Sequence, residues 1–279
     1  MNNDEFEATM RSLEVFHTLR IPDGSYPIIR VDGRGFSKFT KKIGLDKPFD
    51  SRFHCWICSV AKVLLKELGG IYGYTESDEI SILLPRETNL FGREVEKLVS
   101  ISAGMASACS TSMLVPPFTN REESFVTFDS RIVVCNTKLD VVDYFRWRQA
   151  DAQRNCLNSY AFWELVKRGK SPRGASKILH GAGPDLKLEI LDNIGIDFES
   201  LPGWQINGAG VYIDNRETTG YNPLTGEDVM ATRRFIVVDE NLPIRERYAG
   251  FLERIMEVYE NQHVGNAKAR PSDLSRQLY

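Results

Sequence analysis

Three carboxylates stand where apolar segments of the chain end, and this arrangement suits metal-assisted chemistry. Asp32 follows an apolar, β-prone run over residues 26–31, and Asp78 and Glu79 lie in the polar link between two further runs of that kind. If these runs are neighbouring strands, the carboxylates meet at one edge of a sheet. Such oxygens, together with substrate phosphates and water, are the ligands that Mg²⁺ prefers. Two Mg²⁺ ions can bridge the attacking and leaving oxygens of nucleotidyl transfer.

The segment after Asp32 combines glycine with positive charge. Gly33 and Gly35 let the backbone approach a ligand closely, and successive N–H groups there can form an anion-binding nest. The segment lacks the Walker and dinucleotide fingerprints. Taken alone, it also fits an ordinary turn, just as Asp32 can be a turn former and residues 77–79 a solvated tip.

Basic residues gather in three clusters that suit the binding of a triphosphate or a nucleic-acid backbone. Taken alone, each cluster is more often a solvated surface, but acidic residues at a metal site surrounded by basic residues favour phosphate chemistry. The clusters contain Arg30, Arg34, Lys38, Lys41, Lys42, Lys47 and Arg52; then Arg146, Arg148 and Arg154; then Lys167, Arg168, Lys170, Arg173 and Lys177.

Cysteine and histidine give no support to other chemistries. Cys55 and Cys58 have C-x-x-C spacing, but no second Cys/His pair lies nearby for zinc, and both fall on a predicted helix, which favours core packing. The five cysteines are scattered and odd in number, which indicates reduced thiols in a cytoplasmic protein. The four histidines show no triad or metal spacing.

Composition excludes several classes of protein. The chain has 279 residues, of which 42% are hydrophobic and 26% charged, so it is not disordered and can bury a sizeable core. A formal net charge of −3 argues against non-specific coating of nucleic acid. A local basic groove stays compatible with that charge, because salt screens charges beyond about 10 Å. We expect neither a signal peptide nor a membrane span.

The elements that must position these residues follow from periodicity and capping. Helices are expected over 5–19, 50–68, 88–113, 140–167, 184–193 and 245–258, and strands over 26–31, 71–74, 80–84 and 125–135, with a hairpin that pairs 211–215 with 232–239. The order is βαββαβ-like. It predicts an α+β fold in which helices pack on one face of an antiparallel sheet, followed by a C-terminal extension of hairpin and helix.

Four colinear motifs resemble the tRNA-histidine guanylyltransferase superfamily. They are Arg30-Val-Asp-Gly-Arg-Gly-Phe36, Lys47-Pro-Phe-Asp-Ser-Arg52, Tyr72-Gly-Tyr-Thr-Glu-Ser-Asp-Glu79 and Trp147-Arg-Gln-Ala-Asp151. The resemblance implies a palm-like catalytic core related to polymerases that adds nucleotides in the 3′-to-5′ direction. We expect one catalytic domain over 1–242, with a basic extension from about 166 to 242, and a C-terminal helix and tail over 243–279.

The resemblance also implies a set of site residues. Asp32 and Asp78 would be the catalytic ligands of two Mg²⁺ ions, with the Gly33 carbonyl as a further ligand and Glu79 in support. The nucleotide would be bound by Asp32, Gly33 and Asp78 together with Arg34, Gly35, Phe36, Ser37, Lys47, Ser77, Arg93 and Lys97. The candidates for RNA contact are Arg30, Arg148, Arg154, Asn155, Lys170, Arg173 and Lys177.

One departure from the eukaryotic pattern narrows the expected function. Eukaryotic members read His-Ile-Asn-Asn-Leu-Tyr-Asn after the fourth motif, whereas this chain reads Gln153-Arg-Asn-Cys-Leu-Asn-Ser159, and Ser37 stands where those enzymes often carry His. The pattern is similar to the bacterial and archaeal like proteins, which implies template-dependent repair of 5′-truncated tRNA with ATP, GTP and other NTPs by a cytoplasmic homotetramer.

Three alternatives stay open: addition of a single 5′ G to tRNA-His, a palm-type nucleotide cyclase, and an RNA-binding protein with an inactive metal site. The long basic extension argues against a cyclase.

Overall fold

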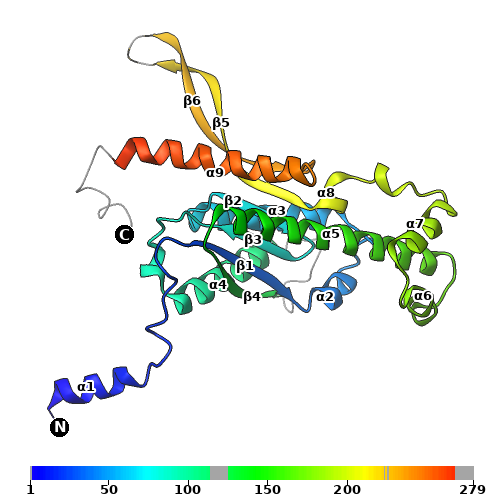
Figure 1. The fold of residues 1–279 in the computed structure, drawn as a ribbon, viewed down its shortest axis with the longest axis horizontal. Coiled ribbons are helices and arrows are strands. Elements are labelled where there is room, and N and C mark those ends of the chain that lie inside the picture. Colours follow the sequence, from blue (N-terminus) through cyan, green and yellow to red (C-terminus); the bar gives the residue numbers. More distant parts are fainter. Residues whose placement is uncertain (1, 114–124, 223, 225, 268–279) are drawn as a thin grey trace.

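A six-stranded antiparallel sheet forms the centre of the protein (Figure 1). The computed structural model describes residues 2–113, 125–222, 224 and 226–267. The strand order is β4-β1-β3-β2-β5-β6, and every neighbouring pair is antiparallel. The strands are β1 (Tyr26–Arg34), β2 (Tyr72–Glu76), β3 (Glu79–Leu83), β4 (Thr127–Cys135), β5 (Ala209–Asn222) and β6 (Glu227–Asp239). The predicted α+β class is confirmed.

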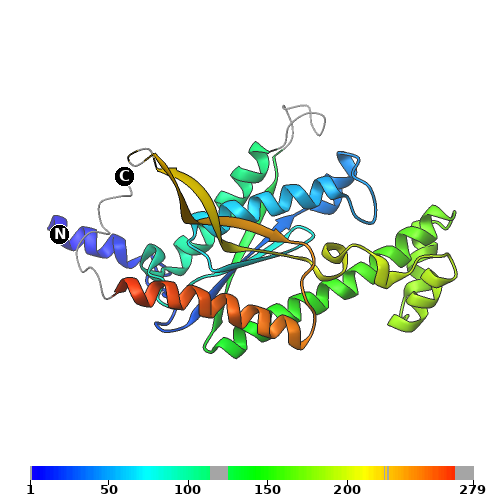
Figure 2. The same ribbon diagram turned by 90° about the horizontal axis from the view of Figure 1, so that it is seen from above.

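Helices connect and cover these strands. They are α1 (Asn3–Ser12), α2 (Phe36–Lys42), α3 (Ser51–Glu67), α4 (Val95–Ser112), α5 (Lys138–Lys167), α6 (Pro172–Leu179), α7 (Pro184–Asp192), α8 (Gly203–Asn207) and α9 (Glu246–Ala267), with 3₁₀ turns η1 (Leu90–Arg93) and η2 (Phe198–Ser200). Figures 1 and 2 show α1 at the opposite end of the molecule from α6 and α7.

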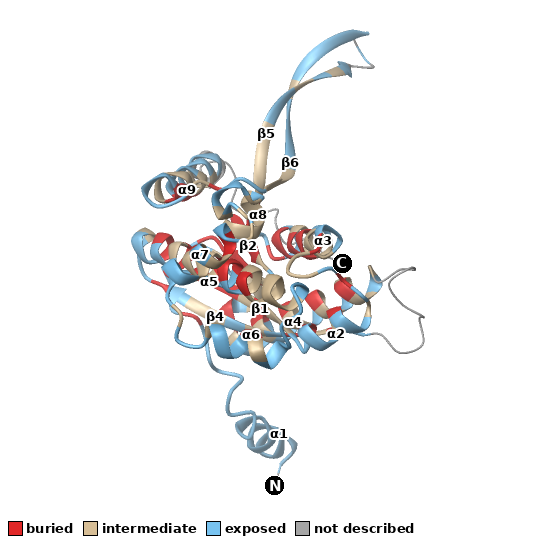
Figure 3. Ribbon diagram, turned by 90° about the vertical axis from the view of Figure 1, so that its right-hand side faces the viewer, coloured by how far each residue is buried: buried red, intermediate tan, exposed pale blue. Residues whose placement is uncertain are grey.

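The central strands of the sheet are covered on both faces, whereas the sequence predicted helices on one face only. Ile29 and Val31 of β1 belong to a core with α3 and α4, while Ile28 belongs to a second core that includes Phe145 of α5 and Tyr248 of α9. Figure 3 shows the buried strands between the two sets of helices. Continuous apolar runs such as the one in β1 are typical of strands covered on both faces.

The long helices begin where capping residues predict. Asp50 caps α3 by accepting a hydrogen bond from the Arg52 N–H. Thr137 and Asp140 form a capping box at the start of α5, which then runs for 30 residues. Both helices agree with the predicted ranges 50–68 and 140–167 to within about two residues at each end.

Other boundaries differ from the predictions for local reasons. The helix predicted over 88–113 is interrupted because Phe91, Gly92 and Arg93 have φ of 52°, 59° and 60°, so α4 begins only at Val95. The helix predicted over 5–19 ends at Ser12, and none of its residues is buried. Helix α6 was not predicted, although Ser171 caps it and proline occupies its first turn.

The hairpin of β5 and β6 extends well beyond the sheet. Only residues 209–212 of β5 pair with β2, while β5 and β6 continue to pair as far as Asn222 and Glu227. The distal hairpin projects from the body as a two-stranded ribbon with mostly exposed residues (Figures 1 and 3). It is longer than the predicted pairing of 211–215 with 232–239. The tail predicted for the last dozen residues lies outside the described residues.

None of the helices in the described part of the chain has both the length and the apolar character needed to cross a bilayer. All five cysteines are free thiols; Cys58 is buried, as predicted, whereas Cys55 is exposed on the outer face of α3.

Candidate active site

Four carboxylates form one row across the sheet. The strand register pairs Asp32 with Asp129 on one side and with Glu79 on the other, and Glu79 with Glu76. Residues directly opposite each other in antiparallel strands point to the same face, so all four side chains lie on one face, the one that α5 covers. The sequence predicted the convergence of Asp32 and Glu79 but not the full row.

Asp78 joins this row from the turn between β2 and β3. Ser77 and Asp78 form a two-residue turn, in which Ser77 adopts φ of 53°. The Asp78 carbonyl accepts a hydrogen bond from the Gly33 N–H at 3.2 Å, and the Ser77 hydroxyl donates to Asp78 Oδ1 at 3.0 Å. The backbone that carries Asp32 therefore touches the turn that carries Asp78.

Gly33 allows this close approach. A Cβ atom at residue 33 would lie 2.4 Å from a ring carbon of Phe36 and 2.8 Å from the Asp78 Cβ. Phe36 is buried against Phe39, Phe53, Trp56 and Phe128, so its ring has no room to move away. Any side chain at residue 33 would push the two carboxylate-bearing segments apart.

The acidic groups at this edge have raised pKa values. Burial and the charge of Asp32 both raise the pKa of Asp78, and burial raises the pKa of Glu79. Burial raises the pKa of Glu76 to about 7. Buried carboxylates with raised pKa values favour a cation beside them. Asp32 and Asp78 supply the hard oxygen donors that fit Mg²⁺, and the Gly33 backbone lies next to both.

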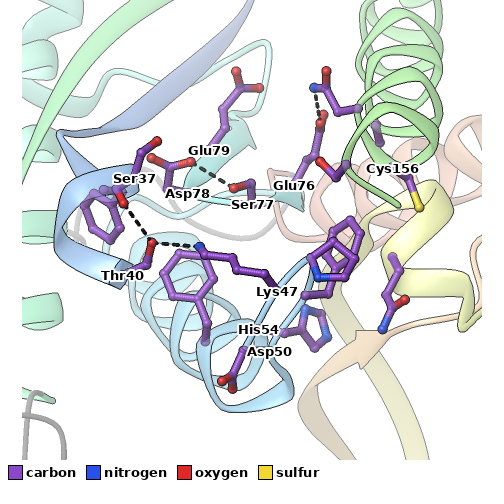
Figure 4. Close-up of a pocket in the computed structure, with 18 of the residues that line it drawn as sticks. Ser37, Thr40, Lys47, Asp50, His54, Glu76, Ser77, Asp78, Glu79 and Cys156 are labelled. Carbon is purple, nitrogen blue, oxygen red and sulfur yellow. Dashed lines mark hydrogen bonds between the residues drawn. The ribbon is translucent and has the colours of Figure 1, made fainter. Parts of the chain in front are cut away.

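A cavity of about 870 Å³ opens in front of these carboxylates. Lys47 is one of the cations that line it: its Nζ donates to the Thr40 hydroxyl at 3.0 Å, and Asp50 and Asp78 partly offset the burial that lowers its pKa. Figure 4 shows the Lys47 side chain reaching Thr40 beneath Asp78 and Ser37. The cavity thus combines carboxylates for a metal with an ammonium group for phosphate.

The far end of the cavity is aromatic. Trp204 of α8 stacks on His54 at 4.2 Å and contacts the ring of Phe49 edge-on, and Phe49 also contacts Tyr160 of α5. Trp163 lines the same wall. Flat aromatic faces beside polar groups suit a nucleobase. The sequence did not predict this wall, because its residues come from three separate segments, 49–54, 160–163 and 204, that only the fold brings together.

Helix α5 contributes a polar network behind the carboxylates. Arg148 is buried, with an exposed fraction of 6%, and its guanidinium lies 2.7 Å from Glu79, 3.0 Å from Asp151 and 3.6 Å from Glu76. Asn155 donates from Nδ2 to Glu76 Oε1 at 2.6 Å. The predicted role of Arg148 and Asn155 was RNA contact, but both side chains face carboxylates of the sheet.

Two predicted triphosphate ligands lie elsewhere. Arg93 is buried and donates to backbone carbonyls of Ile21, Pro22 and Thr88, and Lys97 pairs with Glu94 at 3.2 Å. Neither residue lines the cavity. By contrast, the structure brings together at the cavity or directly beside it Asp32, Gly33, Phe36, Ser37, Lys47, Ser77 and Asp78. Arg34 and Gly35 follow on the chain and are exposed.

The remaining candidates for RNA contact lie in three places. Arg30 is half-buried, near Glu79 and the ring of Trp147. Arg154 is exposed on α5 and pairs with Asp151 at 2.6 Å. The last group is exposed on and before α6, at the outer end of the molecule, and consists of Lys170, Arg173 and Lys177.

Two segments of the chain match protein-family models. Residues 7–136 match a model described as tRNAHis guanylyltransferase, and residues 139–247 match the C-terminal domain of the same family. The tRNA(His) guanylyltransferase of Debaryomyces hansenii is 39% identical over 186 residues, which cover 64% of this chain and 70% of that protein. The enzyme of that name from Kluyveromyces lactis is 34% identical over 220 residues, covering 74% and 92%.

Solved structures are similar in fold. The tRNA(His) guanylyltransferase of Saccharomyces cerevisiae aligns with a TM-score of 0.66 at 26% identity, covering 78% of this chain and 94% of that one. A bacterial tRNA(His) guanylyltransferase-like protein, solved in complex with ATP, aligns with a TM-score of 0.69 at 26% identity, covering 90% and 99%. These matches support a palm-like fold for the central sheet.

Proposed function

This chain belongs to the tRNAHis guanylyltransferase family and is a nucleotidyltransferase, and from that premise we propose that it repairs 5′-truncated tRNA by template-dependent 3′-to-5′ addition of nucleotides. The proposed catalytic residues are Asp32 and Asp78. The proposed phosphate-binding groups are Lys47 and the backbone of 33–37, with Ser37 and Ser77 beside the nucleotide. Arg93 and Lys97 stay proposed triphosphate ligands by resemblance only.

The observation that carries this proposal is the combination of groups in one cavity. Two carboxylates, a partly buried ammonium group and an aromatic wall surround about 870 Å³. This volume is near the upper end of the 300–1,000 Å³ that is typical of ligand pockets, so it suits a nucleotide together with the end of an RNA. A metal ion held by Asp32, Asp78 and the Gly33 carbonyl would neutralise charge on the phosphates during transfer.

The proposed reaction has two steps. In the first, the 5′-monophosphate of the RNA attacks the α-phosphate of ATP, which gives an adenylylated 5′ end and releases pyrophosphate. In the second, the 3′-hydroxyl of an incoming NTP attacks the activated 5′ phosphate and displaces AMP. Lys47 would bind phosphate oxygens in both steps, and the wall formed by Phe49 and Trp204 would hold a base.

Template dependence is supported by the segment after the fourth motif. Gln153 stands where eukaryotic members carry His, and its side chain donates to Asn207 Oδ1 of α8 at 2.8 Å. Its amide is thus engaged within the protein. Together with Ser37, this favours the repair activity over addition of one G keyed to a single tRNA.

We propose that the RNA lies along the basic residues that lead from the cavity to α6. Affinity should then fall steeply with salt, although the net charge of the chain is −3. We also propose that residues 1–242 act as one catalytic unit, that the protein assembles as a homotetramer, and that it works in the cytoplasm, where its free thiols stay reduced.

A tRNA pair tests the proposal. Two tRNAs lacking the 5′ nucleotide, identical except that the opposite base is C in one and A in the other, are incubated with Mg²⁺, ATP and each NTP separately. We expect G to be added to the first tRNA and U to the second. Addition of G to both would support the single-G activity instead. A cyclic product from ATP or GTP without RNA would support a cyclase.

The matched control separates the site from the fold. Asp78→Asn should abolish addition while the protein stays folded, whereas Asp143→Asn, an exposed carboxylate on the outer face of α5, should leave it unchanged. RNA binding without pyrophosphate release in the wild type would support the inactive RNA-binding alternative. Near-wild-type addition by a folded Asp78→Asn protein would overturn the assignment.

A further inference from the structure

The turn that carries Asp78 is short and holds one residue in an unfavourable backbone conformation. It consists of Ser77 and Asp78 alone, between strands of five residues each, and Ser77 is held at φ of 53°. A non-glycine residue in this region of φ carries a cost of the order of 1 kcal/mol or more, so other contacts must hold the turn in place. The two residues that flank the turn, Glu76 and Glu79, are paired directly across the strands.

Helix α5 contacts both residues that flank this turn, Glu76 and Glu79. Arg148 Nε donates to Glu79 Oε1 at 2.7 Å, and Asn155 Nδ2 donates to Glu76 Oε1 at 2.6 Å. The guanidinium of Arg148 also lies 3.6 Å from Glu76, so this one side chain contacts both flanking glutamates. Arg148 and Asn155 are seven residues apart, which places them on the same face of the helix two turns apart.

Arg148 is fixed from the other side as well. Its Nη2 donates to Asp151 at 3.0 Å, one helical turn along, and its guanidinium lies over the ring of Trp147 at 4.6 Å. A buried, four-sided environment of this kind holds the planar guanidinium in one orientation. Arg148 is therefore a rigid link between α5 and the turn.

We propose that Arg148, assisted by Asn155, is a positioning residue that holds the Ser77–Asp78 turn so that the Asp78 carboxylate stays aligned with Asp32. Neither residue needs to touch the substrate for this role. The inference rests on the proposed function only in its consequence for metal binding; the restraint on the turn is independent of the reaction.

Arg148→Lys is the informative variant because it keeps the positive charge and removes the planar fork. An ammonium group cannot donate to Glu79 and Asp151 in the geometry of the guanidinium. A loss of metal affinity in this variant therefore reports the geometry of the guanidinium and not its charge. A variant that removed the positive charge would be harder to interpret, because the neighbouring carboxylates would then attract a cation more strongly. Arg154→Lys is the matched control, an exposed arginine on the same helix that also pairs with Asp151.

Two measurements test the proposal in the full chain. Hydrogen exchange of the β2–β3 hairpin, followed by mass spectrometry, should speed up in Arg148→Lys but not in Arg154→Lys. Mn²⁺ binding, followed by electron paramagnetic resonance, should weaken about tenfold in Arg148→Lys, as is typical when a supporting partner of metal ligands is changed. For nucleotide addition, kcat should fall more than KM rises.

A second substitution checks the mechanism. Ser77→Gly removes the cost of the positive φ, so in the Arg148→Lys background it should slow the exchange of the hairpin again. Mn²⁺ affinity is not compared for this variant, because it also loses the hydroxyl that donates to Asp78 Oδ1. Unchanged hairpin exchange in folded Arg148→Lys would overturn the proposal. If Mn²⁺ binding in the wild type does not depend on Asp78, the proposed metal site fails, but the exchange experiment still decides whether Arg148 restrains the turn.

Discussion

Replacing Gly33 by alanine adds a single methyl group where the two carboxylate-bearing segments meet. The new Cβ would lie 2.4 Å from the Phe36 ring and 2.8 Å from the Asp78 Cβ. Relief must come from the turn, because Phe36 is enclosed by other aromatic rings. Overpacking of this kind costs about 1–3 kcal/mol, so we expect Gly33→Ala to lower the free energy of unfolding by about 2 kcal/mol.

The same displacement should affect activity more strongly than stability. A shift of about 1 Å between reacting groups can lower a rate by about 100-fold. We therefore expect Gly33→Ala to be folded at 25 °C and to show a loss of about two orders of magnitude in kcat for nucleotide addition. Urea unfolding gives the stability, and single-nucleotide addition to a truncated tRNA gives the rate.

Gly104→Ala is the matched control. Gly104 lies within α4, where an added Cβ meets no atom within 4 Å, so alanine should stabilise the protein by about 0.5–1 kcal/mol and leave the rate unchanged. The reasoning is refuted if Gly33→Ala is as stable as the wild type, or if it loses stability but keeps full activity.

Three further predictions concern single side chains. Burial raises the pKa of Glu76 to about 7 in the folded state, so the stability that its protonated form contributes is present at pH 4 and is lost as the pH rises from about 4.5 through 7. In urea unfolding, the free energy of unfolding of Glu76→Gln should therefore exceed that of the wild type by about 1–3 kcal/mol at pH 8 and equal it at pH 4. Arg93→Met should cost about 3 kcal/mol in stability, because several buried carbonyls lose their donor. A raised KM for NTP in the folded fraction would support the triphosphate contact that the resemblance implies, and an unchanged KM would exclude it. Lys47→Met should raise the KM for NTP about tenfold in steady-state assays with little change in stability, and an unchanged KM would exclude Lys47 as a phosphate ligand.

Much of this architecture was readable because local signals and tertiary packing agree. Asp50 and Thr137 cap the two long helices where the sequence places them. The two apolar runs on either side of Asp78 form β2 and β3, with boundaries shifted by one or two residues from the predicted 71–74 and 80–84. The proximity of Asp32 and Asp78 followed from their positions next to these strands.

The rest depended on information that is not local. Strand register places Asp129 and Glu76 in the carboxylate row, and register is set by pairing between segments that lie far apart in the chain. Basic residues in one sequence cluster proved to have different environments: Arg148 is buried among carboxylates, while Arg154 is exposed. Sequence shows charge but not the partner that neutralises it.

The pairing of β5 with β2 makes the two family-model segments of the chain depend on each other. The segment matched by the first family model supplies Asp32 and Asp78, and the segment matched by the second supplies Arg148, Trp204 and the strands β5 and β6 at one end of the sheet. A gene encoding the first segment alone would leave the edge of β2 bare and the cavity without one wall. Each segment therefore completes the other, and we expect neither to form the full sheet and cavity when it is expressed alone.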